Sequence, residues 1–202
     1  MKERGILFSA PMVRALLDGT KTQTRRVANT GLYAIDARTH GDETAARELA
    51  NLVTKCPHGL AGDRLYVRET FGEVYDWCDH PEMPGAPTER WHIEWKYRAD
   101  GEPDRPHLDG AWTGWKPSIH MPRTASRILL EIVSVRVERL QEISEADAAA
   151  EGWQRRPEMS DDPEVHADAA RDWYCDLWEQ INGAGSWAAN PWVWAIEFKR
   201  VD

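Results

Sequence analysis

The chain of 202 residues has few cysteines and no long apolar run. Its three cysteines, Cys56, Cys78 and Cys175, are an odd number, whereas disulfide-stapled secreted domains usually carry an even one. No segment reaches the roughly 18 consecutive apolar residues of a membrane-spanning helix. The N-terminal residues also lack the apolar stretch of a signal peptide. We therefore predict a cytoplasmic protein with free thiols and no membrane contact.

Several motifs of common enzymes and metal sites are also missing. We find no Walker-type loop, no dinucleotide-binding fingerprint and no G-x-S-x-G elbow. The nearest approach to a metal site is a pair of Cys-x-His motifs at residues 56–58 and 78–80. Structural zinc sites usually space the two ligands of a pair more widely. We predict buried thiols and surface histidines here, with no bound metal and no cofactor.

The charge is distributed unevenly along the chain. The formal net charge is −9, yet residues 1–30 carry six Lys/Arg against two Asp/Glu. Positive charge concentrated at one end of an acidic protein favours a local anion site, most simply for phosphate or nucleic acid. The alternative is a solvated basic turn.

The segment at residues 19–26 is the most informative of the chain. It places one lysine, three threonines and two arginines after a glycine turn. Lys21 is a candidate base or phosphate ligand, and Thr24 is a candidate nucleophile or water-positioning group. Arg25 and Arg26 are candidate nucleic-acid contacts. A lysine acts as a base only when neutral, so its pKa must fall well below about 10.4, which neighbouring arginines favour. Catalysis, binding alone and a structural role all remain open for this segment.

Apolar periodicity predicts a mixed α+β chain. Strands are expected at residues 6–8, 22–27, 64–71, 90–97, 126–140 and 192–201, and helices at 11–18, 43–53, 144–151 and 170–181. Residues 75–90 and 99–114 are expected to be loops because of their prolines and glycines. The strand at 126–140 switches its apolar phase after Ile132, which predicts a bulge or a strand curling around a barrel.

The chain carries eleven tryptophans, an unusually large number. Four of them, Trp91, Trp95, Trp112 and Trp115, cluster in a segment of weak periodicity. Such rings either stack on nucleobases or fill the core of a small barrel. Core filling is the expected use for most of them.

The pattern Gly19-x-Lys21-x-x-Thr24-x-Arg26 resembles the signature of the ASCH domain, a PUA-like β-barrel family linked to RNA and nucleotide chemistry. Residues 62–70, 115–123 and 190–194 are similar to segments of phage and prophage ASCH proteins. The resemblance implies an α+β fold built on a small curved PUA-like β-barrel, with flanking helices and long inserted loops. It also implies one domain over residues 1–202, with inserted segments near 30–60 and 72–123.

One branch of the ASCH family removes the acetyl group from N(4)-acetylcytidine. Its proposed triad is a lysine and a threonine three residues apart, plus a later glutamate. Lys21 and Thr24 match the first two positions, and Glu151 is the best match for the third. Glu69, at the expected end of a strand, is a second candidate carboxylate. Its other interpretation is an ion pair with Arg25 or Arg68.

We therefore predict a protein that recognises a modified nucleoside or RNA and hydrolyses an acylated exocyclic amine. Arg68, His120 and Arg123 are further candidate contacts to a phosphate or base, with His120 and Arg123 on an expected loop. For this loop, tight packing without a ligand is the competing interpretation. A non-catalytic RNA or modified-nucleotide binding module and a metal-independent ribonuclease remain as alternatives, since another ASCH branch binds or cleaves RNA.

Overall fold

The computed structural model describes residues 1–28, 42–78, 89–102, 111–154 and 168–201. The chain divides into two compact units. The first comprises Met1–Arg4, Ala15–Leu65 and Leu129–Asp202, and the second Gly5–Arg14 and Tyr66–Ile128. No helix within the described ranges is both long and apolar enough to cross a membrane.

Strands and helices alternate along the chain. The strands are β1 (Glu3–Leu7), β2 (Gln23–Val27), β3 (Arg64–Arg68), β4 (Phe71–Cys78), β5 (Glu89–Tyr97), β6 (Ala111–Trp112), β7 (Leu129–Arg139) and β8 (Trp192–Arg200). The helices are α1 (Ala10–Leu17), α3 (Asp42–Thr54), α4 (Glu145–Ala150) and α5 (Ala169–Asn182). Short 3-10 helices are η1 (Arg98–Asp100), η3 (Ser118–His120), η4 (Arg123–Ala125) and η5 (Leu140–Glu142).

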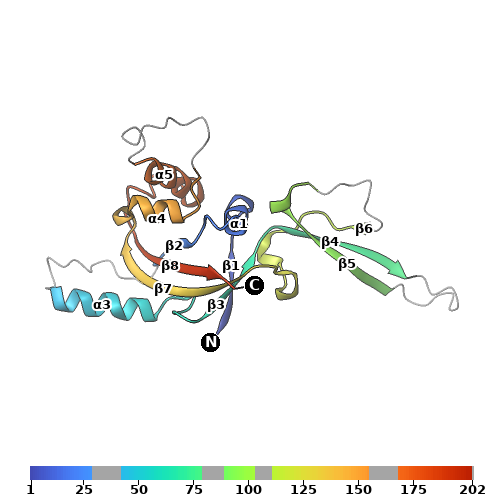
Figure 1. Cartoon of the computed structure of the whole chain (residues 1–202), viewed down its shortest axis with the longest axis horizontal. Coiled ribbons are helices and arrows are strands. Elements are labelled where there is room, and N and C mark those ends of the chain that lie inside the picture. The colour runs from blue at the N-terminus through green and yellow to red at the C-terminus, as the bar shows by residue number, and fades with distance from the viewer. Residues whose placement is uncertain (29–41, 79–88, 103–110, 155–167, 202) are drawn as a thin grey trace. The chain divides into compact units, whose positions relative to one another are not determined.

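The strands form two sheets. One has five strands in the order β1-β3-β7-β8-β2, and the other has three in the order β5-β4-β6 (Figure 1). Strands β2, β7 and β8 lie in the first unit and β4 to β6 in the second, whereas the unit boundary falls within β1 and β3. The predicted mixture of helices and strands is confirmed. Within the described residues β1 and β2 are the edges of the larger sheet, so closure into a barrel stays a prediction.

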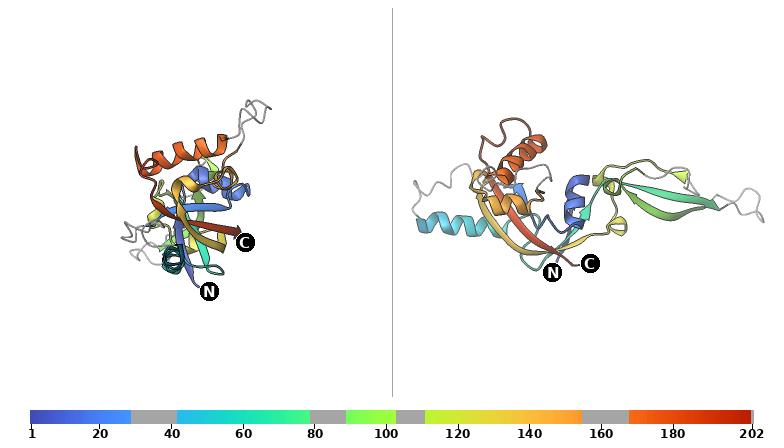
Figure 2. Two further views of the ribbon diagram at one scale, coloured as in Figure 1. Left: turned by 90° about the vertical axis from the view of Figure 1, so that its left-hand side faces the viewer. Right: turned by 45° about the horizontal axis from the view of Figure 1, so that its top comes forward.

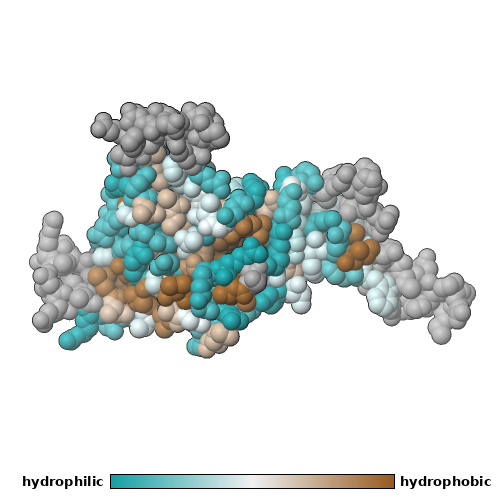
Figure 3. All heavy atoms as spheres, viewed as in Figure 1, coloured by the Kyte–Doolittle hydropathy of each residue, from teal (hydrophilic) through white to brown (hydrophobic). Residues whose placement is uncertain are grey.

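Strand β7 contains the predicted bulge. Its pairing with β8 shifts register between Ile132 and Ser134, so that two β7 residues oppose one step of β8. Ile132 is buried whereas Val133 is exposed, which accounts for the phase switch in the sequence. Val133 is 47% exposed, and Figure 3 shows that apolar residues reach the surface on this face of the molecule.

Helices cover both faces of the β7–β8–β2 part of the sheet (Figure 2). Val193 of β8 packs with residues of α4 and α5 such as Ala148 and Tyr174. Leu52 of α3 packs against Val137 and Trp192 on the opposite face. Side chains alternate between the two faces of a strand. Each side chain of β2 therefore points either toward α4 and α5 or toward α3.

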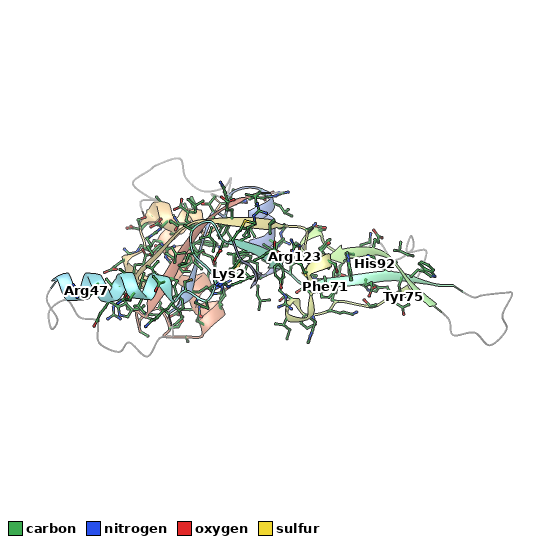
Figure 4. All side chains as sticks on the ribbon, turned by 90° about the horizontal axis from the view of Figure 1, so that it is seen from below. Lys2, Arg47, Phe71, Tyr75, His92 and Arg123 are labelled. Atoms are coloured by element: carbon green, nitrogen blue, oxygen red, sulfur yellow. The ribbon has the colours of Figure 1, made fainter. Side chains whose placement is uncertain are left out.

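The second unit corrects one expectation. Strand β4 continues to Cys78 and β5 begins at Glu89, so residues 75–78 are strand rather than loop, and part of the expected insertion near 72–123 is a sheet. The prolines at 81, 84 and 87 all lie between the two strands. Figure 4 shows β4 and β5 side by side, with Phe71, Tyr75 and His92 labelled. Trp95 packs against a core of Phe71, Met121 and Ala125, the structural use expected for most tryptophans.

Candidate functional site

Lys21 and Glu151 meet in the interior of the first unit. The Lys21 Nζ lies 2.7 Å from Glu151 Oε2 and donates a second hydrogen bond, of 2.9 Å, to the Glu151 main-chain oxygen. Their side chains are 0% and 3% exposed. The two residues also form an isolated β-bridge. Two groups that are 130 residues apart in the sequence thus share one buried contact.

Local structure fixes the position of Glu151. Ser144 caps helix α4 by accepting a hydrogen bond of 3.1 Å from the Asp147 N–H, and the helix ends at Glu151. Gly152 follows with φ 108°, and a Cβ there would lie 3.0 Å from the Ala15 Cβ. Glycine is therefore required for α4 to end this close to the segment that carries Lys21.

Arg25 binds the other oxygen of the same carboxylate. Its Nη1 donates to Glu151 Oε1 at 3.2 Å. Its Nη2 lies 2.7 Å from Glu138 Oε1 and 3.4 Å from Asp147 Oδ2. The guanidinium carbon also lies 5.9 Å from the centre of the Tyr174 ring. Glu151 is therefore shared between an ammonium and a guanidinium.

Residues that sequence reasoning missed complete this network. Gln23 Nε2 donates to Asp147 Oδ1 at 2.8 Å, and Arg136 donates at 2.8 Å to both Asp147 Oδ2 and Glu138 Oε2. Three cations, Lys21, Arg25 and Arg136, thus face the three carboxylates Glu138, Asp147 and Glu151. In the sequence, the alternation of Arg136 and Glu138 along one expected strand indicates that these two side chains share a face.

Burial has the largest effect on the titration of this site. It lowers the pKa of Lys21, Glu151 opposes that shift, and Arg26 and Arg25 add to it. Burial also lowers the pKa of Arg26. The pKa of the Tyr174 hydroxyl is raised well above its usual value, first by burial and then by the negative charge of Glu151. The expected lowering of the Lys21 pKa by arginines is present, but desolvation is the stronger cause.

The structure does not bring Thr24 into this cluster. Thr24 is buried and pairs with Ile196 of β8, so strand alternation puts its side chain on the opposite face from Gln23 and Arg25. Among the described residues, no hydrogen bond joins its hydroxyl to Lys21 or Glu151. Arg26 lies two residues after Thr24, so its side chain is on the same face of β2 as that of Thr24.

Glu69 belongs to the second unit and has a different partner from those expected. It is 1% exposed, and Arg127 donates to both its oxygens, from Nε at 3.0 Å and from Nη2 at 3.2 Å. Sequence reasoning proposed Arg25 or Arg68 for this ion pair, and both are wrong. Nothing in the sequence indicates that Glu69, just after β3, and Arg127, just before β7, lie next to each other.

The other candidate contacts also lie in the second unit. Arg68 donates from Nε to the Met121 main-chain oxygen at 3.2 Å and from Nη2 to that of Ile119, so it anchors the loop. His120 is exposed on η3. The Arg123 guanidinium lies 5.2 Å from the centre of the Tyr66 ring. A role of these residues in ligand binding stays a prediction.

Of the two Cys-x-His pairs, the one at residues 56–58 lies within the described side chains. Cys56 is buried, and burial raises the pKa of its thiol. The second pair, at residues 78–80, lies outside the described side chains. Within the described ranges, no three His, Cys, Asp or Glu side chains are grouped so as to hold a metal ion.

His58 is expected to make stability depend on pH. Burial and the charges of Arg26 and Arg4 lower its pKa to about 4, against 6.5 ordinarily. A histidine whose pKa is depressed by folding contributes stability above pH 6.5, and this contribution is lost as the pH falls toward 4. Wild type should therefore lose more stability across this window than His58→Gln in urea denaturation. Parallel losses in the two proteins would contradict the prediction.

Comparison with known proteins gives little further information. No family model matches the chain, and no curated protein matches it. Among solved structures, the chain is similar to an ASCH domain from Lactobacillus crispatus JV V101, with 13% identity and a TM-score of 0.36. That match covers 98% of this chain and 79% of the other. We therefore argue function from the residues of this chain.

Proposed function

We propose that Lys21 and Glu151 are a buried proton-transfer pair that hydrolyses the acylated exocyclic amine of a nucleoside such as N(4)-acetylcytidine. The supporting observation is the 2.7 Å contact between Lys21 Nζ and Glu151 Oε2. These two residues hold the lysine and glutamate positions that the resemblance to the amidohydrolase branch assigns. Burying such a pair is costly, and strongly perturbed titratable groups are concentrated at functional sites.

Water is the proposed nucleophile. Neutral Lys21 accepts a proton from water as the water oxygen attacks the acyl carbon. The carbon–nitrogen bond then breaks, Lys21 returns the proton to the departing amine, and the products are the free amine and the carboxylic acid. Thr24 is not given the role of nucleophile, because its side chain lies on the other face of β2 from Arg25.

Arg25 resolves a conflict in this mechanism. A carboxylate beside Lys21 holds the proton on the lysine, which opposes its action as a base. The other Glu151 oxygen binds Arg25 at 3.2 Å, so the carboxylate charge is shared between two cations. Burial, the largest cause, lowers the pKa of Lys21. Glu151 then serves mainly to orient Nζ and to stabilise the protonated lysine.

Turnover is expected to depend on Lys21. Purified wild type should release cytidine from N(4)-acetylcytidine, detected by mass spectrometry, and Lys21→Met should be at least about 100-fold slower. Lys199→Met, which removes an exposed lysine, is the matched control and should keep wild-type activity. Thr24→Val should stay within about tenfold of wild type if water is the nucleophile. A wild-type protein that leaves acylated nucleosides intact would contradict the hydrolase proposal.

A non-catalytic binding module is the second candidate function. The connected cations and carboxylates around Glu151, with hydrogen bonds among them, are also what a rigid recognition site needs. This alternative predicts that wild type binds N(4)-acetylcytidine and returns it unchanged. Titration calorimetry on the same samples distinguishes the two functions.

A further inference from the structure

The outer edge of β5 is open in the described part of the second unit. In the order β5-β4-β6, this strand has a neighbour on one side only. Its pairing with β4 shifts register between Val74 and Tyr75, and Ile93 is the extra residue of the resulting bulge. Beyond the bulge, residues 94–97 form a short regular edge. An open edge is a template for pairing with another strand.

The hydrogen bonds of β4 show which main-chain groups of this edge point outward. Phe71 exchanges two main-chain hydrogen bonds, of 3.2 and 2.7 Å, with Lys116, and both main-chain groups of Glu73 also bond on that side. Neither residue therefore directs a main-chain group toward β5. Their partners on β5 are Tyr97 and Trp95. In an antiparallel pair of this type the groups of both residues point apart, so Trp95 and Tyr97 direct their N–H and C=O out of the sheet edge.

A cavity of about 390 Å³ lies along these outward groups. It is lined by residues 94–97 of β5, by residues 100–102 and by Trp115. Its carboxylates are each paired with a cation of the chain, such as Glu94 with Lys96 at 2.7 Å. Within the described ranges, the main-chain groups of Trp95 and Tyr97 form no hydrogen bond beyond the sheet. The cavity therefore offers main-chain hydrogen bonding, which is what an added strand requires.

We propose that the chain forms a two-fold dimer in which β5 pairs antiparallel with β5 of a second copy. A register centred on Trp95 joins its outward N–H and C=O to those of the partner's Trp95. It also places Glu94 across from the partner's Lys96, and Lys96 across from the partner's Glu94. The two side chains are 45% and 33% exposed, and their opposite charges make the strand complementary to itself in this orientation.

The same orientation gives cover to two exposed apolar side chains of β5. Trp91 and Ile93 are 57% and 48% exposed. Both precede Trp95, so in the antiparallel pair they run along the part of the partner that follows its own β5 centre. That part, residues 97–102, lines the cavity. Each copy thus covers its apolar side chains with the cavity of the other, as an isologous interface requires.

Charge reversal tests both the pairing and its register. In sedimentation equilibrium with the full chain, wild type should show a reversible monomer–dimer equilibrium at concentrations up to about 200 µM. Lys96→Glu places like charges across the interface twice and should raise the dimer dissociation constant at least about tenfold. Glu94→Lys should do the same. An equimolar mixture of the two variants should restore the wild-type constant, because each copy then faces opposite charges.

Lys199→Glu is the matched control. It reverses an exposed lysine that is also ion-paired, with Glu131 at 2.9 Å, and should leave the dissociation constant unchanged. A wild type that stays monomeric over the whole range would overturn the proposal, as would a dimer that Lys96→Glu does not weaken.

The mixing experiment has its own decisive outcome. If circular dichroism shows both variants folded and their mixture still stays monomeric, the register centred on Trp95 is wrong. The double variant Glu94→Lys/Lys96→Glu repeats this test in one chain and should dimerise like wild type. The inference does not rest on the hydrolase proposal, because none of these results depends on turnover of N(4)-acetylcytidine.

Discussion

Replacing Glu151 with glutamine is expected to lower the free energy of unfolding by about 3–5 kcal/mol at pH 7. Glutamine keeps the volume of the side chain, so the loss reports the missing charge. Lys21, with a side chain 0% exposed, then loses the carboxylate 2.7 Å away, so the interior must hold either an unpaired ammonium or a lysine that has given up its proton. Arg25 is less affected, because it retains Glu138 and Asp147.

The exposed pair of Lys199 and Glu131 gives the control. Its atoms are 2.9 Å apart, similar to the buried pair, but the side chains are 60% and 30% exposed. Glu131→Gln should therefore lower stability far less than Glu151→Gln does in urea denaturation. The double variant Lys21→Met/Glu151→Gln should lose less than the sum of its single variants, because no unpaired ammonium remains. Strictly additive losses would show that the two side chains are not energetically coupled.

Lys21 and Glu151 could be singled out from the sequence, whereas the charged residues around them could not. The resemblance to the amidohydrolase branch named both residues, although 130 positions separate them. Glu138 and Arg136 belong to no motif, and their contacts depend on how β7 and β8 pair after the bulge at Ile132. Asp147 lies on α4 and contacts Arg25 and Arg136 from there. Register is a long-range property, set by side-chain packing across strands rather than by local propensity.

Two other differences between expectation and structure have local causes. A strand over residues 22–27 was expected, and its alternation already separates Thr24 from Arg25, yet the motif grouped Thr24 with the reactive residues. The prolines of the 75–90 segment led to a loop over its whole length. The prolines at 81, 84 and 87 fall in the sequence between β4 and β5, and neither strand contains one, as expected because proline cannot donate a strand hydrogen bond. The partner of Glu69 could not be predicted, since Arg127 lies 58 residues away.

Replacing Arg127 with methionine is expected to lower the free energy of unfolding by about 3–5 kcal/mol at neutral pH. Here the cation of a buried pair is removed and the carboxylate is left behind. Glu69 is 1% exposed and accepts from Arg127 with both oxygens, so the variant leaves a buried carboxylate without this cation. Methionine preserves much of the apolar contact with the Tyr97 ring that the arginine makes. The loss therefore reports mainly the unpaired charge.

The pH dependence of this loss separates a charge effect from a packing effect. Burial raises the pKa of Glu69, and Arg127 acts in the opposite direction, so its removal should raise that pKa further. A carboxyl whose pKa is raised by folding contributes stability while it is protonated, and this is lost as the pH rises through the folded pKa. The deficit of Arg127→Met relative to wild type should thus be largest at pH 7 and shrink on acidification. The double variant Arg127→Met/Glu69→Gln should recover much of the stability at pH 7. A deficit that is constant with pH and unrelieved by Glu69→Gln would instead assign the arginine's contribution to its contacts with the Tyr97 ring and Asp100.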